Sequence, residues 1–359
     1  MKGLVLAGGL GTRMRPLTHT GPKQLIPVAN KPVLFYGIED LVNAGIREIG
    51  MIVGYTEDRI KSIRDAVGDG SRWGCRISYI EQDAPRGLAH AVWTAKDFLG
   101  NDKFVVYLGD NMIKGGIAHF VQDFEKSGAD ANILLAEVPD ARKFGVAVLK
   151  GDEVVEVEEK PKQPKSNYAI TGIYMFNHRI FSIIETLNPS GRGELELTHA
   201  LDRLIKSPDH KITAHVVEGW WDDAGSFEDI LHANHLVLND METKIDGKIE
   251  EGATVIGNIQ LGEGSVVEKG AFIRGPAIIG KHCTISTGTY IGPYTAIGSS
   301  STIKSGEIES SIIMDGSFID IGGDKIVDSL VGKGSNIVLH NGLPKGRRFV
   351  LGENSEVKL

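Results

Sequence analysis

Between Ile249 and Ile303 an aliphatic residue stands at every sixth position of this chain, ten times in succession. The positions are Ile249, Val255, Leu261, Val267, Ile273, Ile279, Ile285, Ile291, Ile297 and Ile303. A period of six fits neither an α-helix nor an isolated hairpin, and it is typical of a parallel β-helix whose coils each take three hexads. We therefore predict a left-handed parallel β-helix over residues 241–340, with looser register after Glu309.

The first 240 residues have a different pattern, in which short β-branched runs alternate with amphipathic stretches of helical length. KGLVLAG and EIGMIVG are expected strands, and VLFYGIEDLVNAG between them is an expected helix. Strands separated by helices predict an α/β fold with a Rossmann-like, mostly parallel sheet. Ser226 is expected to cap a linker helix over 226–240. The predicted domains are 1–240 including that helix, 241–340, and a tail over 341–359.

Charge and cysteine content exclude several classes of protein. The 39 Lys and Arg residues are outnumbered by 47 Asp and Glu, which gives a net charge of -8 and argues against a nucleic-acid surface. No segment reaches the roughly 18 consecutive apolar residues of a membrane span. Cys75 and Cys283 are far apart and lie in no CxxC motif, so neither a disulfide framework nor a zinc site is expected. We expect a cytoplasmic protein.

The stretch LAGGLGTRMRPLTHTGPKQLIPV, residues 6–28, follows the first expected strand. Loops at the carboxyl ends of parallel strands are where open α/β folds bind ligands. The stretch is not a Walker A loop, because GK[ST] is missing, and Met14 prevents a GxGxxG match. Glycine lets backbone amides approach phosphate oxygens, and Arg13 adds a forked cation. We predict an anion-binding loop; the alternative is an ordinary tight turn beside a surface arginine.

Motifs along the whole first domain carry a resemblance: GGLGTRMRPLT with PKQLIP, GDGSRWG, EQDAPRGLAHA, LGDN, FGVAVL, EEKPKQPKSNYAITGIY, RGELELT and WWDDAG. Together they resemble the sugar nucleotidyltransferases, or nucleoside-diphosphate-sugar pyrophosphorylases. The Lys23–Gln24 pair is similar to members that transfer thymidylyl groups to glucose 1-phosphate, and the hexapeptide domain is similar to that of their long form. The resemblance implies in-line attack of glucose 1-phosphate on the α-phosphorus of dTTP, giving dTDP-glucose and pyrophosphate.

The resemblance also implies which side chains neutralise charge, since phosphate is already a nucleophile at neutral pH and no general base is needed. Arg13 is expected on the β- and γ-phosphates, Lys23 near the α-phosphate, Lys160 on the sugar phosphate and Arg192 near the phosphates. The expected catalytic residues are therefore Arg13, Lys23, Lys160 and Arg192.

A magnesium ion is the expected cofactor, because Mg²⁺ typically takes one or two protein carboxylates and completes its shell with phosphates and water. Asp110, at the end of an expected strand, and Asp223, in WWDDAG, are the expected ligands. Asp222 is the local alternative to Asp223.

Further residues are expected to bind the two substrates. The nucleotide set is Leu6, Gly8, Gly9, Gly11, Thr12, Gln24, Gln82 and Gly87, in which Gln82 pairs with the imide edge of thymine or uracil. The sugar-phosphate set is Gly145, Glu159, Lys160, Ile170, Thr171 and Glu194, in which the two Glu bind sugar hydroxyls. Arg86 and His90 depart from the commoner PDGLAQA pattern and are expected to lie near the base without contacting it.

Several alternatives stay open at this stage. UTP could replace dTTP, and another sugar 1-phosphate could replace glucose 1-phosphate, because a single methyl group is worth only about 1 to 3 kcal/mol of discrimination. The β-helix could carry an acyltransferase site at His282 or His340, or the chain could be an inactive regulatory subunit. The flat sides of a β-helix favour a homo-oligomer, and an allosteric nucleotide-sugar site on the first domain is a further hypothesis.

Overall fold

The computed structural model describes residues 1–9, 11–19, 21–54, 56–151, 153–339 and 355–356. These residues form two compact units. The first comprises Met1–Gly11, Gly21–Leu25 and Val33–Asp223, and the second comprises Thr12–Thr20, Ile26–Pro32 and the chain from Ala224 onward. The predicted tail over 341–359 lies outside the described residues, apart from 355–356. Among the helices described, none is long and apolar enough to cross a membrane.

Helices of the first unit are α1 (Val33–Asn43), α2 (Glu57–Val67), α3 (Leu88–Thr94), α4 (Lys96–Leu99), α5 (Ala118–Ser127), α6 (Ile180–Ile184) and α7 (Leu197–Lys206). Its 3-10 turns are η2 (Lys23–Leu25), η3 (Ser71–Trp73) and η4 (Ala141–Lys143). Its strands are β1 (Lys2–Leu6), β4 (Glu48–Val53), β5 (Arg76–Glu81), β6 (Phe104–Leu108), β7 (Met112–Ile113), β8 (Ala131–Glu137), β9 (Gly145–Lys150), β10 (Glu153–Glu159), β11 (Tyr168–Phe176), β12 (Ile212–Val216) and β13 (Trp221–Asp222).

The main sheet of this unit has the order β10-β9-β11-β6-β1-β4-β5, with β8 joined to β11 and β12 to β8. Strands β6, β1, β4 and β5 run parallel, whereas β11 pairs antiparallel with β6, β8 and β9. The predicted Rossmann-like sheet is confirmed, as a mixed sheet: β6, β1, β4 and β5 form its parallel part and β12 runs parallel to β8, whereas β9, β10 and β11 pair antiparallel. The chain leaves β1 for β4 on one side and later reaches β6 on the other, so the carboxyl end of β1 lies where the strand order reverses. Ligands bind at such a position in open α/β sheets.

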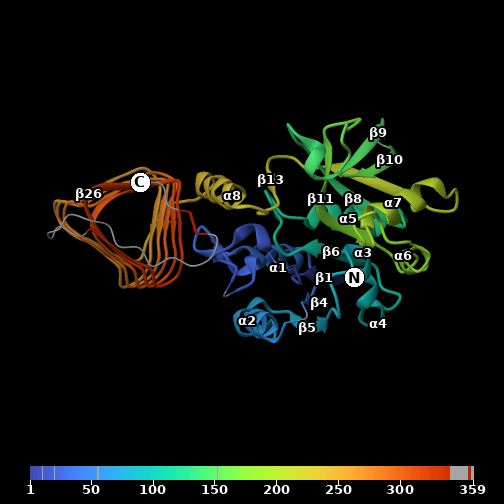
Figure 1. Ribbon diagram of the computed structural model, residues 1–359, viewed down its shortest axis with the longest axis horizontal. Helices are drawn as coiled ribbons and strands as arrows, with labels where there is room; N and C mark the ends of the chain where they lie inside the picture. The colour runs from blue at the N-terminus through green and yellow to red at the C-terminus, as the bar shows by residue number, and fades with distance from the viewer. Residues whose placement is uncertain (10, 20, 55, 152, 340–354, 357–359) are drawn as a thin grey trace. The chain divides into compact units, whose positions relative to one another are not determined.

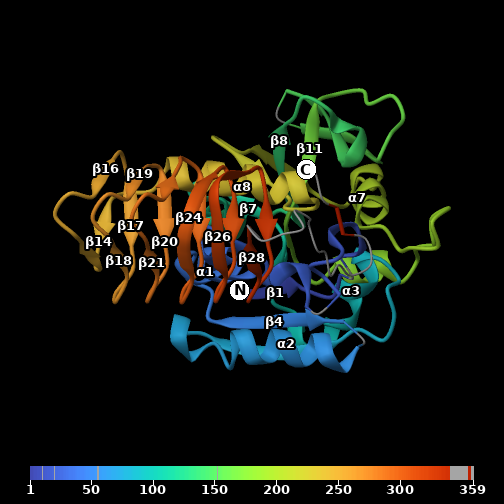
Figure 2. The ribbon, with the colours of Figure 1, turned by 60° about the vertical axis from the view of Figure 1, so that its left-hand side comes forward.

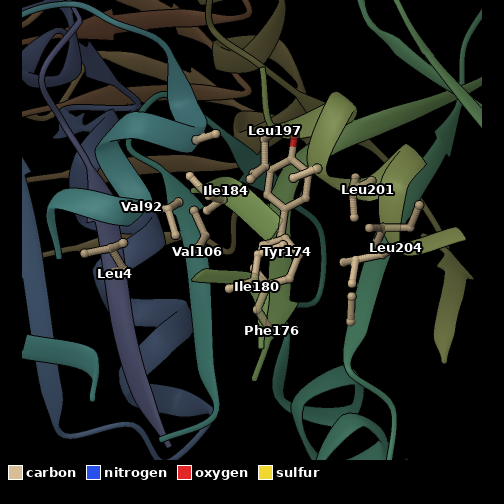
Figure 3. Packing of buried hydrophobic residues seen from close by; sticks show 14 of the residues in the cluster. Leu4, Val92, Val106, Tyr174, Phe176, Ile180, Ile184, Leu197, Leu201 and Leu204 are labelled. Carbon is tan, nitrogen blue, oxygen red and sulfur yellow. The ribbon is translucent and has the colours of Figure 1, made fainter. Parts of the chain in front are cut away.

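Both faces of the sheet are covered by helices, because successive side chains of a strand point to opposite faces. Leu4 and Leu6 of β1 pack with residues of α3, α4, α6 and α7, whereas Val5 and Ala7 pack with residues of α1, α2 and α5. Figure 1 labels this strand and these helices. Figure 3 shows the first of these cores, in which β11 meets α6 and α7 through Tyr174, Phe176, Ile180, Ile184, Leu197, Leu201 and Leu204. The two cores therefore bury both faces of the sheet whose strand ends carry the predicted site residues.

The second unit contains η1 (Thr12–Met14), α8 (Phe227–Asn239) and a series of short strands. The strands are β2 (Pro27–Val28), β3 (Lys31–Pro32), β14 (Lys244–Ile245), β15 (Lys248–Ile249), β16 (Thr254–Ile256), β17 (Ile259–Leu261), β18 (Val266–Val267), β19 (Phe272–Arg274), β20 (Ala277–Ile279), β21 (Thr284–Ile285), β22 (Tyr290–Ile291), β23 (Thr295–Ile297), β24 (Thr302–Glu309), β25 (Ile312–Ile313), β26 (Phe318–Val327), β27 (Leu330–Val331) and β28 (Asn336–Val338).

From β14 onward these strands form the predicted left-handed β-helix. Val267 pairs with Ile285 and Ile285 with Ile303, so residues eighteen apart stack in parallel, as three hexads per coil require. Figure 2 shows the coils side by side. The change of register after Ile303 is also present, since Ile291 pairs with Ile308 and not with Glu309.

Helix α8 begins as the sequence predicts, because the Ser226 hydroxyl accepts a hydrogen bond from the Asp229 amide at 3.3 Å. The compact units nevertheless divide the chain differently from the predicted domains. Asn234 of α8 accepts from the Ala29 amide at 2.9 Å and donates to the Tyr294 carbonyl at 2.9 Å. This side chain therefore ties an early segment, α8 and the β-helix into one unit. The predicted boundary after residue 240 stays a prediction.

Replacing Ile285 by alanine is expected to destabilise the β-helix by about 2 to 5 kcal/mol, the usual cost of truncating a buried Ile. Ile285 is completely buried between the stacked Val267 and Ile303. Chemical denaturation followed by circular dichroism measures the effect. The exposed Lys304→Ala is the control and should change stability by less than about 0.5 kcal/mol. Equal midpoints for the two variants would contradict the stacking.

Candidate active site

The strand order of the first unit places three predicted site residues close to strand ends. Gly8 comes shortly after β1, Gln82 follows β5, and Asp110 follows β6 by two residues. Since these parallel strands end at the same edge of the sheet, the three residues lie along one edge. The backbone supports the arrangement, because the Gly109 amide donates to the Leu6 carbonyl at 2.9 Å.

The glycines after β1 leave room beside polar side chains. A Cβ atom at Gly8 would lie 3.5 Å from Gln82 Oε1, and one at Gly9 would lie 3.5 Å from Gln24 Nε2 and 3.9 Å from Lys23 Cε. Gln24 is buried, and its Oε1 atom has no hydrogen-bond partner among the described residues. A buried acceptor without a donor is costly, so a ligand donor at this place would be favourable. The predicted nucleotide residues Gly8, Gly9, Gln24 and Gln82 therefore come together.

Lys23 and Asp110 form a partly buried ion pair in this structure. Their side chains are only 12% and 19% exposed, respectively. The other carboxylate oxygen of Asp110 accepts from Asn111 Nδ2 at 3.0 Å. Asn111 is itself buried, and its Oδ1 accepts from the Gly172 amide at 3.0 Å and from Trp221 Nε1 at 2.7 Å. Asn111 thus fixes the direction of the Asp110 carboxylate from behind.

The expected metal ligands flank two paired strands, because Asp110 precedes β7 by two residues and Asp223 directly follows β13. Asp222 pairs with Met112 across the antiparallel β13–β7 ladder, and the next residue along, Asp223, is therefore level with Asn111. Asp222 is buried and Asp223 is half-buried. Within the described part of the chain no group of three or more His, Cys, Asp and Glu side chains could hold a metal by itself. Two carboxylates at a sheet edge nevertheless fit Mg²⁺, which needs only one or two protein ligands when phosphates supply the rest.

Replacing Gly172 by alanine is expected to lower turnover by about tenfold or more, because a Cβ atom there would lie 2.6 Å from Asn111 Cγ. Asn111 would have to move, and Asp110 would lose its orienting hydrogen bond. Steady-state kinetics checks the effect. Gly191→Ala is the matched control, since a Cβ at Gly191 would meet nothing within 4 Å. Equal turnover of the two variants would show that Asn111 does not position Asp110.

Four of the predicted sugar-phosphate residues, Gly145, Glu159, Lys160 and Ile170, lie together in another part of the same sheet. Gly145 of β9 pairs with Glu159 of β10. A Cβ at Gly145 would lie 3.4 Å from Glu159 Oε2 and 3.5 Å from Ile170 Cδ1, so the three residues are neighbours. Lys160 follows with a φ of 46°, and its Nζ lies 3.8 Å from Glu159 Oε1. A positive φ is unfavourable for lysine, and such strain is commonly found at functional sites.

Arg192 links two carboxylates of this region. Its guanidinium is 2.9 Å from Glu159 and 2.8 Å from the buried Glu196, while Thr198 Oγ1 donates to Glu159 Oε2 at 3.1 Å. Burial lowers the pKa of Arg192, but hydrogen bonding and the charge of Glu196, followed by Glu159, outweigh burial and raise the pKa overall. Arg192 and Lys160 are thus both gathered around Glu159.

Gly87 and Glu194 lie next to each other. Gly87 has a φ of 99°, and a Cβ there would lie 2.5 Å from the Leu195 carbonyl oxygen and 3.0 Å from Glu194 Cβ. Only glycine fits this position. Thr171, by contrast, is completely buried, and its hydroxyl accepts from the Ile173 amide at 3.3 Å. Thr171 could contact the sugar, as predicted, only if the residues that cover its side chain moved.

Thr12 and Arg13 belong to the second compact unit, where both lie exposed in η1. Gly11 ends the first segment of the first unit with a φ of 62°, a left-handed conformation that favours glycine. The predicted phosphate-binding stretch is therefore divided between the two units. Lys23 and Gln24 return to the first unit.

Two residues of this region were missed by the sequence reasoning. Asn111 stands in the LGDN motif. An amide side chain directly after the acidic residue at the end of a strand was the sequence feature that could have indicated it. His90, expected only near the base, has its Nδ1 3.1 Å from Gln82 Nε2, and both side chains are buried. A histidine eight residues after a glutamine gives no pattern by which that hydrogen bond could be predicted.

Residues 2–240 match the model of the nucleotidyl transferase family. The chain belongs to this family, and within it to the nucleotidyltransferases that use sugar 1-phosphates.

Among its curated relatives, a glucose-1-phosphate thymidylyltransferase of Streptomyces antibioticus is 50% identical over 267 residues, 74% of each chain. A low-salt glycan biosynthesis nucleotidyltransferase of Haloferax volcanii is 50% identical over 264 residues, 73% of each chain. Both alignments are longer than the 2–240 region that matches the family model, so in both cases the similarity extends into the β-helix.

Solved structures support the fold of the first unit. A Bacillus anthracis protein assigned as glucose-1-phosphate thymidylyltransferase, crystallised with sucrose, superposes with a TM-score of 0.63 at 38% identity, covering 68% of this chain and 97% of that one. UDP-glucose pyrophosphorylase with UDP-glucose gives 0.60 at 26% identity, covering 67% of this chain and 99% of that one. The resemblance to sugar nucleotidyltransferases is thus confirmed.

Proposed function

We propose that this chain transfers a thymidylyl group from dTTP to glucose 1-phosphate, releasing dTDP-glucose and pyrophosphate. The observation that carries the proposal is the 47–50% identity to glucose-1-phosphate thymidylyltransferases of two Streptomyces species over 74% of the chain. The grouping of Lys23, Gln24 and Gln82 beside the glycines after β1 supports it, because these residues offer a cation and amide groups to a nucleotide.

In this proposal Lys23 exchanges its Asp110 partner for the α-phosphate when the nucleotide binds. Its ammonium group then neutralises charge that develops as the sugar phosphate oxygen attacks the α-phosphorus in line with the departing pyrophosphate. Asp110 is left with its Asn111 hydrogen bond and a free oxygen. Asp110 and Asp223 would hold Mg²⁺, which supplies charge neutralisation on the phosphates when bound.

The acceptor sugar is assigned to the group around Glu159. Lys160 and Arg192 supply positive charge for the sugar phosphate, and Arg192 would turn from Glu159 towards it. Glu159, with Glu194, would then accept hydrogen bonds from sugar hydroxyls. Positioning both substrates along one rigid sheet edge is the main contribution to rate, because the chemistry needs no added base. Arg13 is proposed to bind the β- and γ-phosphates.

Pyrophosphate release with Mg²⁺ tests the substrate assignment. The nucleotides dTTP, UTP, GTP and ATP are crossed with the 1-phosphates of glucose, galactose, mannose and N-acetylglucosamine. The proposal predicts the highest kcat/KM for dTTP with glucose 1-phosphate, with UTP as the nearest competitor because thymine and uracil differ by one methyl group. Release confined to a purine nucleotide or to another sugar phosphate would refute the assignment.

A further inference from the structure

Beside the loop after β1, Gln82 and His90 form a buried pair of polar side chains. Gln82 Nε2 and His90 Nδ1 are 3.1 Å apart, and each residue is only 8% exposed. Gln82 Oε1 lies on the other side of the amide, 3.5 Å from where a Cβ at Gly8 would stand. The two ends of the amide therefore face different neighbours, the nitrogen towards α3 and the oxygen towards the glycine loop.

The orientation of that amide depends on the protonation of His90. Gln82 Nε2 is a donor, so the hydrogen bond requires His90 Nδ1 to be an acceptor, and the ring proton must then sit on Nε2. Asp83 Oδ1 lies 3.6 Å from His90 Nε2 and favours a proton at that nitrogen. Asp83, His90 and Gln82 thus form a chain of contacts. The Asp83 carboxylate favours one tautomer of His90, and that tautomer determines the orientation of the Gln82 amide.

Which end of the Gln82 amide faces the glycine loop matters, because pyrimidine bases differ in the hydrogen-bonding groups along one edge. Thymine and uracil present an N3–H donor, whereas cytosine has an acceptor at N3 and an amino group at C4. An amide whose oxygen faces the base accepts from the imide N3–H and repels the cytosine N3. Turning the amide over reverses this preference.

We propose that His90 is a positioning residue that holds the Gln82 amide with its oxygen towards the glycine loop and thereby selects thymine and uracil over cytosine. The inference rests on the proposed function, in which Gln82 meets the base. The inference adds His90 as a determinant of which nucleotide is used, and it makes the preference for thymine and uracil over cytosine depend on pH.

The pH dependence has a definite sign. Burial is the main influence on the pKa of His90 and lowers it; the charge of Asp83 raises it in part, and Arg86 lowers it further. His90 is therefore neutral at neutral pH and gains a second ring proton only in more acidic solution. The doubly protonated ring cannot accept from Gln82, so the amide must turn and the preference for imide bases must fall as pH falls.

The test is the ratio of kcat/KM for dTTP to that for dCTP, each with glucose 1-phosphate, measured from about pH 8 to about pH 5.5. Because the two nucleotides carry the same triphosphate, titration of the phosphates cancels in the ratio. We expect the ratio of the wild-type enzyme to fall at acidic pH. In His90→Leu we expect it to be about five- to tenfold lower throughout, the effect of one hydrogen bond.

His90→Gln is the rescue variant, because its amide oxygen accepts from Gln82 at every pH. We expect it to keep the high ratio of the wild-type enzyme and to lose the pH dependence. Asp83→Asn, at an exposed residue, should lower the ratio at neutral pH without loss of folding. A packing role for His90 would change kcat but not the ratio.

Three results would overturn the inference. The first is an unchanged ratio in an active His90→Leu enzyme, and the second is a pH-independent ratio in the wild-type enzyme. The third is a wild-type pH profile retained by His90→Gln, which decides the matter even if His90→Leu fails to fold. By contrast, a wild-type enzyme that uses neither dTTP nor UTP would overturn the proposed function itself, and the inference with it.

Discussion

Lys23→Ala is expected to lower kcat by about 10² to 10³, the usual effect of removing one preorganised group that stabilises transition-state charge. Lys23 is only 12% exposed and is held against Asp110, so its ammonium group is already placed before substrate binds. Removing it leaves Asp110 without its cation as well, and a carboxylate then faces the incoming phosphates. Steady-state kinetics with dTTP and glucose 1-phosphate measures the loss.

The control for this experiment is Lys61→Ala on α2. Lys61 is 75% exposed and pairs with its helical neighbour Asp65, away from the candidate site residues, so the kinetic constants should not change. A rise in KM with unchanged kcat in Lys23→Ala would mean that Lys23 binds the ground state and the transition state equally. Turnover near the wild-type value would show that the lysine is not at the reacting phosphate.

Asp110→Asn is expected to raise the Mg²⁺ concentration for half-maximal rate by at least about tenfold, and to lower the maximal rate. The substitution keeps the shape of the side chain but removes the negative charge that Mg²⁺ prefers in its ligands. Asn111, packed behind it, should hold the new side chain in a similar position. The effect is therefore on metal affinity more than on folding.

Metal titrations of the rate, with thermal unfolding measured in parallel, separate these effects. Asp123→Asn, at an exposed position of α5, is the control and should titrate like the wild-type enzyme. An unchanged titration in Asp110→Asn would remove Asp110 from the metal site and leave Asp223 and Asp222 as candidates.

The β-helix could be predicted from the sequence because its period is a property of the chain alone. One aliphatic residue per hexad is enough to define which side chains stack, and Val267, Ile285 and Ile303 do so in the structure. The parallel part of the sheet was predictable for a similar reason, since the sequences of β1 and β4 are short, mostly apolar runs on either side of a stretch of helical length.

The parts that escaped prediction depend on residues far apart in the chain. Asn111 receives its hydrogen bonds from Gly172 and Trp221, and neither pairing leaves a local pattern. Asn234 joins Ala29 to the β-helix across more than two hundred residues, so the early segments within the second unit could not be assigned from local sequence. Such contacts follow only from the complete fold.

In the candidate site, too, single residues could be predicted from the sequence, whereas the contacts between them could not. Motif positions predict site roles for Lys23, Asp110 and Glu159, because strand ends and charged residues are visible in the sequence. The sequence did not indicate that Lys23 and Asp110 pair with each other, or that Arg192 pairs with Glu159. These ion pairs place opposite charges together, and in the proposed function Lys23 and Arg192 each change partner when a phosphate binds.

The most direct test of the account is to follow the phosphate oxygens of glucose 1-phosphate through the reaction. The sugar phosphate is prepared with a heavy-oxygen label in its non-bridging positions and is incubated with dTTP, Mg²⁺ and the enzyme, and both products are analysed by mass spectrometry. Attack by the sugar phosphate on the α-phosphorus predicts all of the label in dTDP-glucose and none in pyrophosphate. Label in pyrophosphate, or no nucleotide sugar at all, would contradict nucleotidyl transfer at this site.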